Sequence, residues 1–279
     1  MESIATSQLA TLSHPQRLAI FRLLVRRYPA EVPAGEIASV LSFKANTTSV
    51  YLSALLNSEL VSQRRKGTSL LYRANLQSAE NLIQFLFNDC CRGRPDICLV
   101  KDTAEADRQT EKQCGKHRVL FICTGNSARS ILAEAMLRHE AGDKFEVHSA
   151  GAHPFSQINP YALAILKTRG IETAPLRAKN VAEFQNPDAP AFDFVFTVCD
   201  LAANEECPTW RGQPISAHWG LPDPVKATGT ESEKRVAFQQ TFEAVSNRVK
   251  AFSALPFGSL DRASLQKYVD EIGTIPETT

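Results

Sequence analysis

The spacing of apolar and polar residues predicts that the first third of the chain is helical. From about residue 4 to residue 90, apolar positions recur at helical intervals in several short segments. In QRLAIFRLLVRR, residues 16–27, this spacing predicts one apolar helix face, made by Leu18, Phe21, Leu24 and Val25. We therefore expect a compact, mainly α-helical domain.

The remaining two thirds of the chain alternate between two patterns. Three short runs predict strands: HRVLFIC, KFEVHSAG and AFDFVFTVCD. Segments with a helical period, such as RSILAEAMLRHEA and NPYALAILKTRG, lie between these runs. Because strands that alternate with helices build open parallel sheets, we expect an α/β domain here.

A polar, charged stretch with little periodicity, RGRPDICLVKDTAEADRQTEKQCGK, separates the two patterns. The length of 279 residues also exceeds the usual ~100 to 200 residues of one domain. We therefore place an N-terminal domain at residues 1–98, a linker at 99–116 and a second domain at 117–279.

Composition and charge limit the kind of partner. With 43% hydrophobic residues, 22% charged residues and a net charge of +1, the chain has no global attraction for nucleic acid or membrane, so any nucleic-acid site must be local. The chain has no run of 18 apolar residues and no secretory pattern, which argues against membrane spanning and export. Its seven cysteines, an odd number, fit a reducing compartment. We expect a cytoplasmic protein.

A helix-turn-helix pattern occupies the middle of the N-terminal domain. One helix should end near Phe43 and a second should begin near Asn46, and the following VSQRRKGTSLLYRA predicts a β-hairpin that turns at Lys66-Gly67. The second helix and the hairpin tip would contact DNA bases and phosphates. The candidate contacts are Asn46, Thr47, Thr48, Ser49, Tyr51, Arg64, Arg65 and Lys66. The alternative is a small helical domain with a solvated basic hairpin.

The segment HPQRLAIFRLLV, together with this helix pair and wing, resembles the ArsR/SmtB family of winged-helix arsenical repressors over about residues 4 to 90. The resemblance implies a homodimer that binds operator DNA and leaves it when an inducer binds. Most members that sense arsenic through a cysteine pair in the DNA-binding helices carry it near the position of SVLSFKAN. This chain has no cysteine there, which excludes that site.

Three cysteines lie instead in FNDCCRGRPDIC: Cys90, Cys91 and Cys98. Three thiols can converge on a soft, three-coordinate ion such as As(III) or Sb(III), whereas zinc would need a fourth ligand. A subgroup of arsenic repressors has a similar C-terminal arrangement, which implies arsenite or antimonite as inducer. The alternative is that these cysteines act as small hydrophobic residues that close a helix.

A loop between Cys123 and Ser130, called the Cys loop below, opens the second domain. In VLFICTGNSARSI, a strand should end at Cys123 and a helix should begin near Ser130, so that the intervening N–H groups cradle an oxyanion above the thiol. The predicted cradle comprises Thr124, Gly125, Asn126, Ser127, Ala128, Arg129 and Ser130. The helix N-terminus and Arg129 should stabilise the thiolate of Cys123, and the Arg129 guanidinium can hold two oxygens of a tetrahedral anion.

The later segment AHWGLPDPV offers Asp223, before Pro224, as a general acid. The Cys loop and the Asp-Pro resemble the low-molecular-weight tyrosine phosphatase fold over about residues 117 to 257. Phosphatase activity is therefore one alternative. Such phosphatases carry aromatic residues after the Asp-Pro, whereas residues 225–227 are Val-Lys-Ala, so we expect the aromatic pocket wall to be missing.

Two further cysteines favour reduction over hydrolysis. TVCDLAANEECP carries Cys199 at the end of a predicted strand and Cys207 eight residues later. Two electrons can reach a bound anion by successive thiol exchange, which hydrolysis does not need. Taken singly, Cys199 would be a buried hydrophobic residue and Cys207 incidental.

This cysteine set resembles the thioredoxin-coupled arsenate reductase (ArsC) family. The resemblance implies that Cys123 attacks arsenate, Asp223 assists departure of a hydroxyl, Cys199 attacks Cys123, and Cys207 attacks Cys199. It also implies that Asn126 holds the loop backbone and that Ser130 hydrogen-bonds the thiolate. The expected reductant is an external dithiol, thioredoxin rather than glutathione with glutaredoxin, and no tightly bound cofactor is expected. Ala128 replaces a cysteine that several relatives carry.

Taken together, the motifs predict an arsenite-responsive repressor fused to an arsenate reductase. The product of the second domain would then be the inducer of the first. Two alternatives remain open: a phosphatase with a DNA-binding arm, and a regulator whose second domain binds an oxyanion without turnover.

Overall fold

A computed structural model describes residues 2–90, 115–186, 189–205, 210 and 213–276. The chain divides into two compact units, Met1–Thr103 and Ala104–Thr279, each with its own hydrophobic core. None of the helices in the described ranges is long and apolar enough to span a bilayer.

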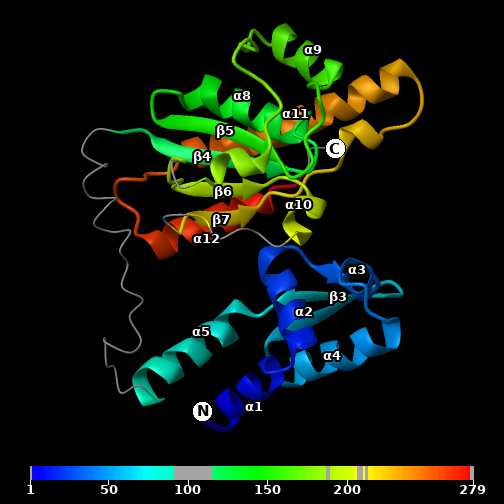
Figure 1. Ribbon diagram of the computed structural model, residues 1–279, viewed down its shortest axis with the longest axis vertical. Coiled ribbons are helices and arrows are strands. Elements are labelled where there is room, and N and C mark those ends of the chain that lie inside the picture. The colour runs from blue at the N-terminus through cyan, green and yellow to red at the C-terminus, as the bar shows by residue number, and fades with distance from the viewer. Residues whose placement is uncertain (1, 91–114, 187–188, 206–209, 211–212, 277–279) are drawn as a thin grey trace. The chain divides into compact units, whose positions relative to one another are not determined.

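The first unit combines short helices with a small antiparallel sheet (Figure 1). Its strands, in the order β1-β3-β2, are β1 (Val32–Pro33), β2 (Val61–Lys66) and β3 (Ser69–Ala74). Its helices are α1 (Glu2–Leu12), α2 (Pro15–Arg26), α3 (Ala34–Val40), α4 (Ala45–Asn57), α5 (Leu76–Phe85) and the π-helical turn η1 (Leu86–Cys90).

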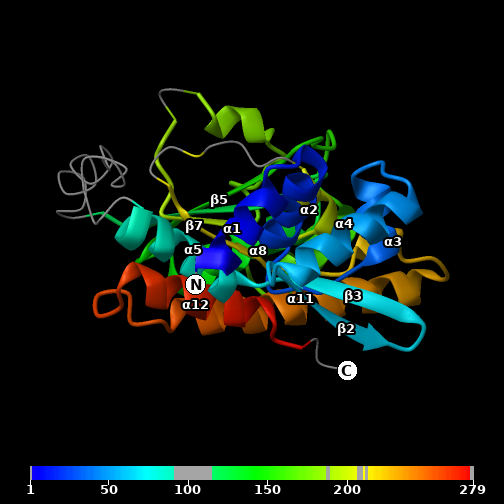
Figure 2. The same ribbon diagram turned by 90° about the horizontal axis from the view of Figure 1, so that it is seen from below.

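The predicted helix pair and basic hairpin are both present, as α3 with α4 and as β2 with β3. Gly67 turns the hairpin with a φ of +61°, a backbone conformation that glycine adopts without strain. The hairpin packs against α3 and α4 (Figure 2). The hairpin thus packs on the same helix pair that carries the other candidate DNA contacts.

The apolar face predicted for α2 is wrong in part. Leu18 and Val25 are 38% and 39% exposed, whereas Ile20, Leu23 and Leu24 are completely buried. Both sets have helical spacing, so the period could not decide which stripe faces the core. The packing of α2 against α4 and β3 decides it.

The second unit has the predicted open parallel sheet, with strand order β5-β4-β6-β7 (Figure 1). Its strands are β4 (His117–Cys123), β5 (Phe145–Gly151), β6 (Phe194–Thr197) and β7 (Ile215–His218). Its helices are α8 (Arg129–Ala141), α9 (Pro160–Thr168), α10 (Asp200–Asn204), α11 (Glu231–Ser253) and α12 (Arg262–Gly273), with 3-10 turns η2 (Val181–Phe184) and η3 (Pro224–Lys226).

The register of the strands brings their carboxyl ends to one edge. Cys123 pairs with Gly151, Ile122 with Thr197, and Thr197 with His218. Loops that follow parallel strands at such an edge are where open α/β sheets bind their ligands. The sheet thus brings together the segments that carry both predicted thiols.

An aromatic core supports this edge. Trp219, directly after β7, stacks on Phe196 with ring centroids 4.1 Å apart, and Phe252 of α11 packs edge-on against both rings. The C-terminal helix α12 packs against β7, and Trp219 Nε1 donates to the carbonyl of Val269 at 2.9 Å. Helix α12 therefore supports the strand that leads to Asp223.

Candidate active site

The Cys loop wraps around the sulfur of Cys123. The backbone N–H of Asn126 donates to Cys123 Sγ at 3.1 Å, and Ser130 Oγ lies 2.9 Å from the same sulfur. Asn126 has a φ of +43°, the left-handed conformation that turns the backbone back over the thiol. Because α8 begins at Arg129, the N–H groups of a helix N-terminus lie next to this loop. The arrangement can hold a tetrahedral oxyanion above Cys123.

The pKa of Cys123 departs from the sequence prediction. Burial raises the pKa of this thiol above its ordinary value and outweighs the hydrogen bonds from Ser130 and Asn126, which lower it. The expected lowering of the thiol pKa is therefore wrong, and the physical reason is the burial of the sulfur. Arg129 forms an ion pair with a carboxylate of the same unit.

That carboxylate is Asp223, the predicted general acid. Arg129 Nη2 lies 2.9 Å from Asp223 Oδ2, and Arg129 Nη1 donates to the carbonyl of Leu221 at 3.0 Å. Asp223 also caps η3, since its Oδ1 accepts from the N–H of Val225 at 3.2 Å. These contacts place the acid beside the Cys loop, within reach of an anion held by Arg129.

Cys199 lies at the neighbouring strand end. Its sulfur is 3.4 Å from Thr124 Oγ1, in the Cys loop, and the residue is 1% exposed. It is also the N-cap of α10, where its sulfur accepts from the N–H of Ala202 at 3.4 Å. The two buried thiols of Cys123 and Cys199 are thus both linked to one loop. Cys207 lies outside the described residues.

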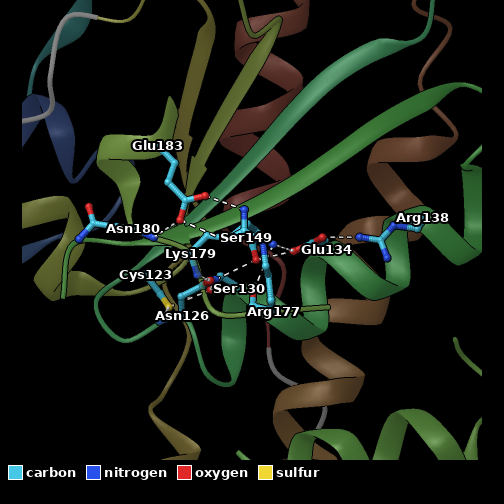
Figure 3. A network of polar contacts seen from close by, with 10 residues as sticks. All are labelled: Cys123, Asn126, Ser130, Glu134, Arg138, Ser149, Arg177, Lys179, Asn180 and Glu183. Atoms are coloured by element: carbon cyan, nitrogen blue, oxygen red, sulfur yellow. Dashed lines mark hydrogen bonds and ion pairs between the residues drawn. The ribbon is translucent and has the colours of Figure 1, made fainter. Parts of the chain in front are cut away.

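The side chain of Asn126 anchors the Cys loop to β5 and to the backbone at Lys179 (Figure 3). Its amide nitrogen donates to Ser130 Oγ at 2.9 Å and to Ser149 Oγ at 2.8 Å, while its oxygen accepts from the N–H of Lys179 at 2.7 Å. Asn126 is fully buried. Three hydrogen bonds therefore fix the residue whose backbone bends around the sulfur, as the family resemblance implied.

A buried ion pair continues this network, and sequence analysis missed it. Ser149 Oγ donates to Glu134 Oε2 at 2.5 Å, and Lys179 Nζ lies 2.9 Å from the same oxygen. The side chains of Glu134 and Lys179 are 3% and 7% exposed, and Arg138 also contacts Glu134 (Figure 3). The one signal in the sequence was Glu134 among the apolar residues of SILAEAML, residues 130–137.

An aromatic side chain from another segment also lies at the loop, although the residues after Pro224 are not aromatic. Phe155 is 59% exposed, and its N–H donates to the carbonyl of Gly125 at 2.9 Å. Its ring lies so close that a Cβ at Gly125 would be 2.5 Å from Phe155 Cε2. The sequence prediction considered only the residues after Asp223, whereas this ring follows β5.

In the first unit, two of the predicted DNA contacts are corrected. Thr48 is 1% exposed and its hydroxyl donates to the carbonyl of Lys44 at 3.1 Å, so it belongs to the core. Tyr51 is half-buried, packs against the rings of His14 and Phe43, and donates to Gln16. Neither side chain is presented for base contacts.

The other candidates in this unit are accessible to solvent. Thr47 is half-buried, and five residues are exposed: Asn46, Ser49, Arg64, Arg65 and Lys66. Arg64 forms a bidentate ion pair with Glu31, with Nε 2.9 Å from both carboxylate oxygens. The candidate surface thus consists of the first turn of α4 and the hairpin tip.

The proposed arsenic ligands are only partly described. Cys90 is exposed at the end of η1, whereas Cys91 and Cys98 lie outside the described residues, as does Cys114. Within the described ranges, no cluster of three or more His, Cys, Asp or Glu side chains could hold a metal ion.

Comparisons with known proteins address the second unit. Residues 118–268 match the model of the family described as low molecular weight phosphotyrosine protein phosphatase. An arsenate reductase of Bacillus licheniformis is 35% identical over 139 residues, which are 50% of this chain and 96% of that protein. An arsenate reductase of Bacillus subtilis is 36% identical over 135 residues, which are 48% of this chain and 94% of that protein.

Proposed function

The chain belongs to the low molecular weight phosphotyrosine protein phosphatase family, and on that premise we propose that it reduces arsenate to arsenite through Cys123, Cys199 and Cys207. The main support is the position of Cys199, whose buried sulfur lies 3.4 Å from Thr124 Oγ1 of the Cys loop. The names of the two Bacillus relatives support the same substrate.

The first step is substitution at arsenic. The loop N–H groups and the Arg129 guanidinium bind the oxygens of arsenate, and Cys123 Sγ forms a bond to arsenic. One arsenic–oxygen bond breaks, and Asp223 passes the proton released by the Cys123 thiol to the departing oxygen, which leaves as water. The 2.9 Å contact between Arg129 and Asp223 supports this division of roles, because it places the acid beside the anion-binding group.

The second step is the redox step. Cys199 attacks the Cys123 sulfur, the sulfur–arsenic bond breaks, and its electron pair goes to arsenic, which leaves as arsenite. Cys207 then attacks Cys199, which frees Cys123 and leaves a Cys199–Cys207 disulfide. An external dithiol supplies two electrons to reduce this disulfide. We propose thioredoxin rather than glutathione with glutaredoxin as the source.

The test is arsenate-dependent consumption of NADPH in the presence of thioredoxin and thioredoxin reductase. The glutathione and glutaredoxin system is run in parallel. We expect turnover with the first system and loss of turnover in Cys123→Ser, Cys199→Ser and Cys207→Ser. Steady turnover in Cys199→Ser would contradict the thiol relay.

One observation favours phosphatase activity as a second candidate function. The exposed ring of Phe155 lies against Gly125 of the Cys loop, where it could contact an aryl group on a bound phosphate. Hydrolysis needs Cys123 and Asp223 but neither Cys199 nor Cys207. Aryl phosphate hydrolysis that survives Cys199→Ser, without arsenate-dependent turnover in the wild type, would favour this function.

For the first unit, we propose an operator-binding repressor of the ArsR/SmtB type that acts as a homodimer. The exposed polar side chains of Asn46 and Ser49, together with the basic hairpin tip, support a DNA-binding surface. Arsenite or antimonite bound by Cys90, Cys91 and Cys98 would release the DNA.

The test measures binding to DNA upstream of the coding sequence with and without arsenite. If the arsenite made by the second unit is the inducer of the first, arsenate should release the DNA only when the thiol relay is active. If Cys123→Ser protein, supplied with reductant, still left the DNA fully in response to arsenate, the link would be wrong. Arsenate binding without turnover would instead favour a regulator with a non-catalytic second domain.

A further inference from the structure

A second set of polar contacts fixes the helical turn that carries Cys199. Helix α10 begins at Asp200, directly after Cys199, and spans five residues. A helix this short is not stable through its own hydrogen bonds, because nucleation costs more free energy than a single turn returns. The position of α10 therefore depends on contacts with the sheet.

His218 provides such a contact. It ends β7 and pairs in register with Thr197, which ends β6. Its Nε2 lies 3.0 Å from Asp200 Oδ1, and its Nδ1 lies 2.9 Å from Thr197 Oγ1. A carboxylate only accepts hydrogen bonds, so Nε2 carries the proton and donates it to Asp200. The Thr197 hydroxyl can donate to Nδ1 or accept from it, so both ring nitrogens have partners.

The surroundings leave this contact little freedom. The His218 side chain is 3% exposed, whereas that of Asp200 is 58% exposed. A Cβ at Gly220 would lie 2.6 Å from His218 Nε2 and 3.1 Å from Asp200 Oδ1, so the backbone there closes over the bond. The sheet thus presents a fixed ring to a carboxylate that is otherwise largely in solvent.

The contact bears directly on the sulfur of Cys199. Because Cys199 caps the same turn, a shift of Asp200 would carry Cys199 Sγ away from Thr124 Oγ1 and the Cys loop. Cys199 must lie near Cys123 for the first thiol exchange. The Cys loop itself has no part in the His218–Asp200 bond.

We propose that His218 is a positioning residue for Cys199, which it holds at the Cys loop through Asp200. This inference rests on the proposed arsenate reductase function. The bond sets the rate at which Cys199 reaches the Cys123 sulfur and leaves oxyanion binding unchanged. His218 itself touches neither the substrate nor the sulfurs.

The first test needs no arsenate. Native Asp200→Ala protein is treated with iodoacetamide, and alkylation of Cys199 is followed by peptide mass spectrometry. Because Asp200 is exposed, its removal leaves the core intact. We expect Cys199 to react at least about tenfold faster than in the wild type, as fits the loss of a hydrogen bond to a charged group. Cys123, in the same sample, should react at its wild-type rate.

The matched control is Asp200→Asn, whose amide oxygen can still accept from His218 Nε2. It should keep most of the protection of Cys199 that Asp200→Ala loses, because a neutral hydrogen bond remains where the charged one was. Equal alkylation rates of Cys199 in the wild type and Asp200→Ala would overturn the positioning role. An Asp200→Asn protein as reactive as Asp200→Ala would do the same, because the hydrogen bond would then not be the cause.

The second test is a single turnover without external dithiol, in which each protein releases one arsenite as Cys123 and Cys199 form a disulfide. We expect Asp200→Ala to release arsenite at least about tenfold more slowly with unchanged arsenate affinity. A purely structural defect would weaken arsenate binding as well. No arsenite from the wild type would contradict the proposed function, whereas the alkylation test of the His218–Asp200 hydrogen bond would still stand.

Discussion

Lys179 Nζ lies 2.9 Å from Glu134 Oε2 beneath the Cys loop, and both side chains are almost completely buried. Ser149 and Asn126 connect this pair to the loop, so that a charge-compensated network supports the residue that bends the backbone around the sulfur. A buried ion pair contributes little net stability when intact, but the loss of one partner leaves an uncompensated charge.

We therefore expect Lys179→Met to destabilise the second unit. Arg138 still contacts Glu134 and compensates part of its charge, so the expected loss is about 2 to 3 kcal/mol in the free energy of unfolding. Urea denaturation followed by tryptophan fluorescence measures it. The double variant Lys179→Met with Glu134→Gln should recover at least half of the loss.

The exposed ion pair of Arg177 and Glu183 offers a matched control. Arg177→Met should cost less than about 1 kcal/mol, because solvent screens exposed pairs. If Lys179→Met and Arg177→Met lowered the free energy of unfolding by the same amount, the buried pair would have no special role in supporting the loop.

Ser130 should control the reactivity of Cys123. Its hydrogen bond lowers the pKa of the thiol, in opposition to the burial that raises it. Ser130→Ala should therefore raise the thiol pKa further and slow alkylation of Cys123 at neutral pH several-fold, because less of the reactive thiolate is present. The pH dependence of iodoacetamide alkylation, followed by peptide mass spectrometry, measures the shift.

Ser127→Ala provides the comparison, since Ser127 is buried in the same loop and its backbone carbonyl accepts from Asn159. It should leave the alkylation profile of Cys123 close to that of the wild type. An unchanged profile in Ser130→Ala would show that the 2.9 Å contact does not stabilise the thiolate.

The sequence predicted those parts of the site that local patterns encode. The apolar run before Cys123 predicted a buried strand, and the spacing to Arg129 and Ser130 predicted a loop between that strand and a helix. The structure has this strand, and a loop that turns its backbone over the sulfur before the helix begins. The approach of Cys199 to this loop was implied by the family resemblance, and the parallel neighbours β4 and β6 account for it in the structure. These are features of short segments and of the fold class.

Features that depend on packing between distant segments could not be predicted. Glu134 and Lys179 are 45 residues apart, and nothing near Lys179 in the sequence indicates burial. Thr48 lies at a polar position of an exposed first turn, yet it faces the core because α4 packs against α2. The neighbouring elements decide which of two helical stripes is buried and which charged side chains pair. The spacing of apolar residues along the sequence does not.

Asp270 on α12 should make stability depend on pH. Burial, with a smaller contribution from the nearby charge of Glu271, raises the pKa of Asp270 to about 6. In the unfolded chain this carboxyl should titrate near ~3.9, so the folded state binds its proton more tightly. The stabilisation from the protonated form is complete below pH ~4 and is lost as the pH rises through about 6.

Asp270→Asn, which cannot ionise, should therefore be more stable than the wild type at pH 8, by about 1 kcal/mol because solvent screens this partly exposed group. The difference should disappear by about pH 4. Urea denaturation across this range measures it, with Glu271→Gln as the comparison that should change little. A stability difference independent of pH would contradict ionisation of Asp270 as its cause.

Glu31 should weaken the proposed binding of DNA by the hairpin. It forms a bidentate ion pair with Arg64, which lowers the pKa of Glu31 and holds a negative charge beside a predicted phosphate contact. Glu31→Gln should free Arg64 and remove repulsion of the phosphates, which should tighten binding about three- to tenfold. Fluorescence anisotropy with DNA from upstream of the coding sequence, at two salt concentrations, measures the effect.

Arg65→Ala is the comparison: it should weaken DNA binding and reduce the salt dependence of that binding, because one phosphate contact is lost. Weaker binding by Glu31→Gln would mean that the ion pair orders the hairpin for DNA instead of competing with it.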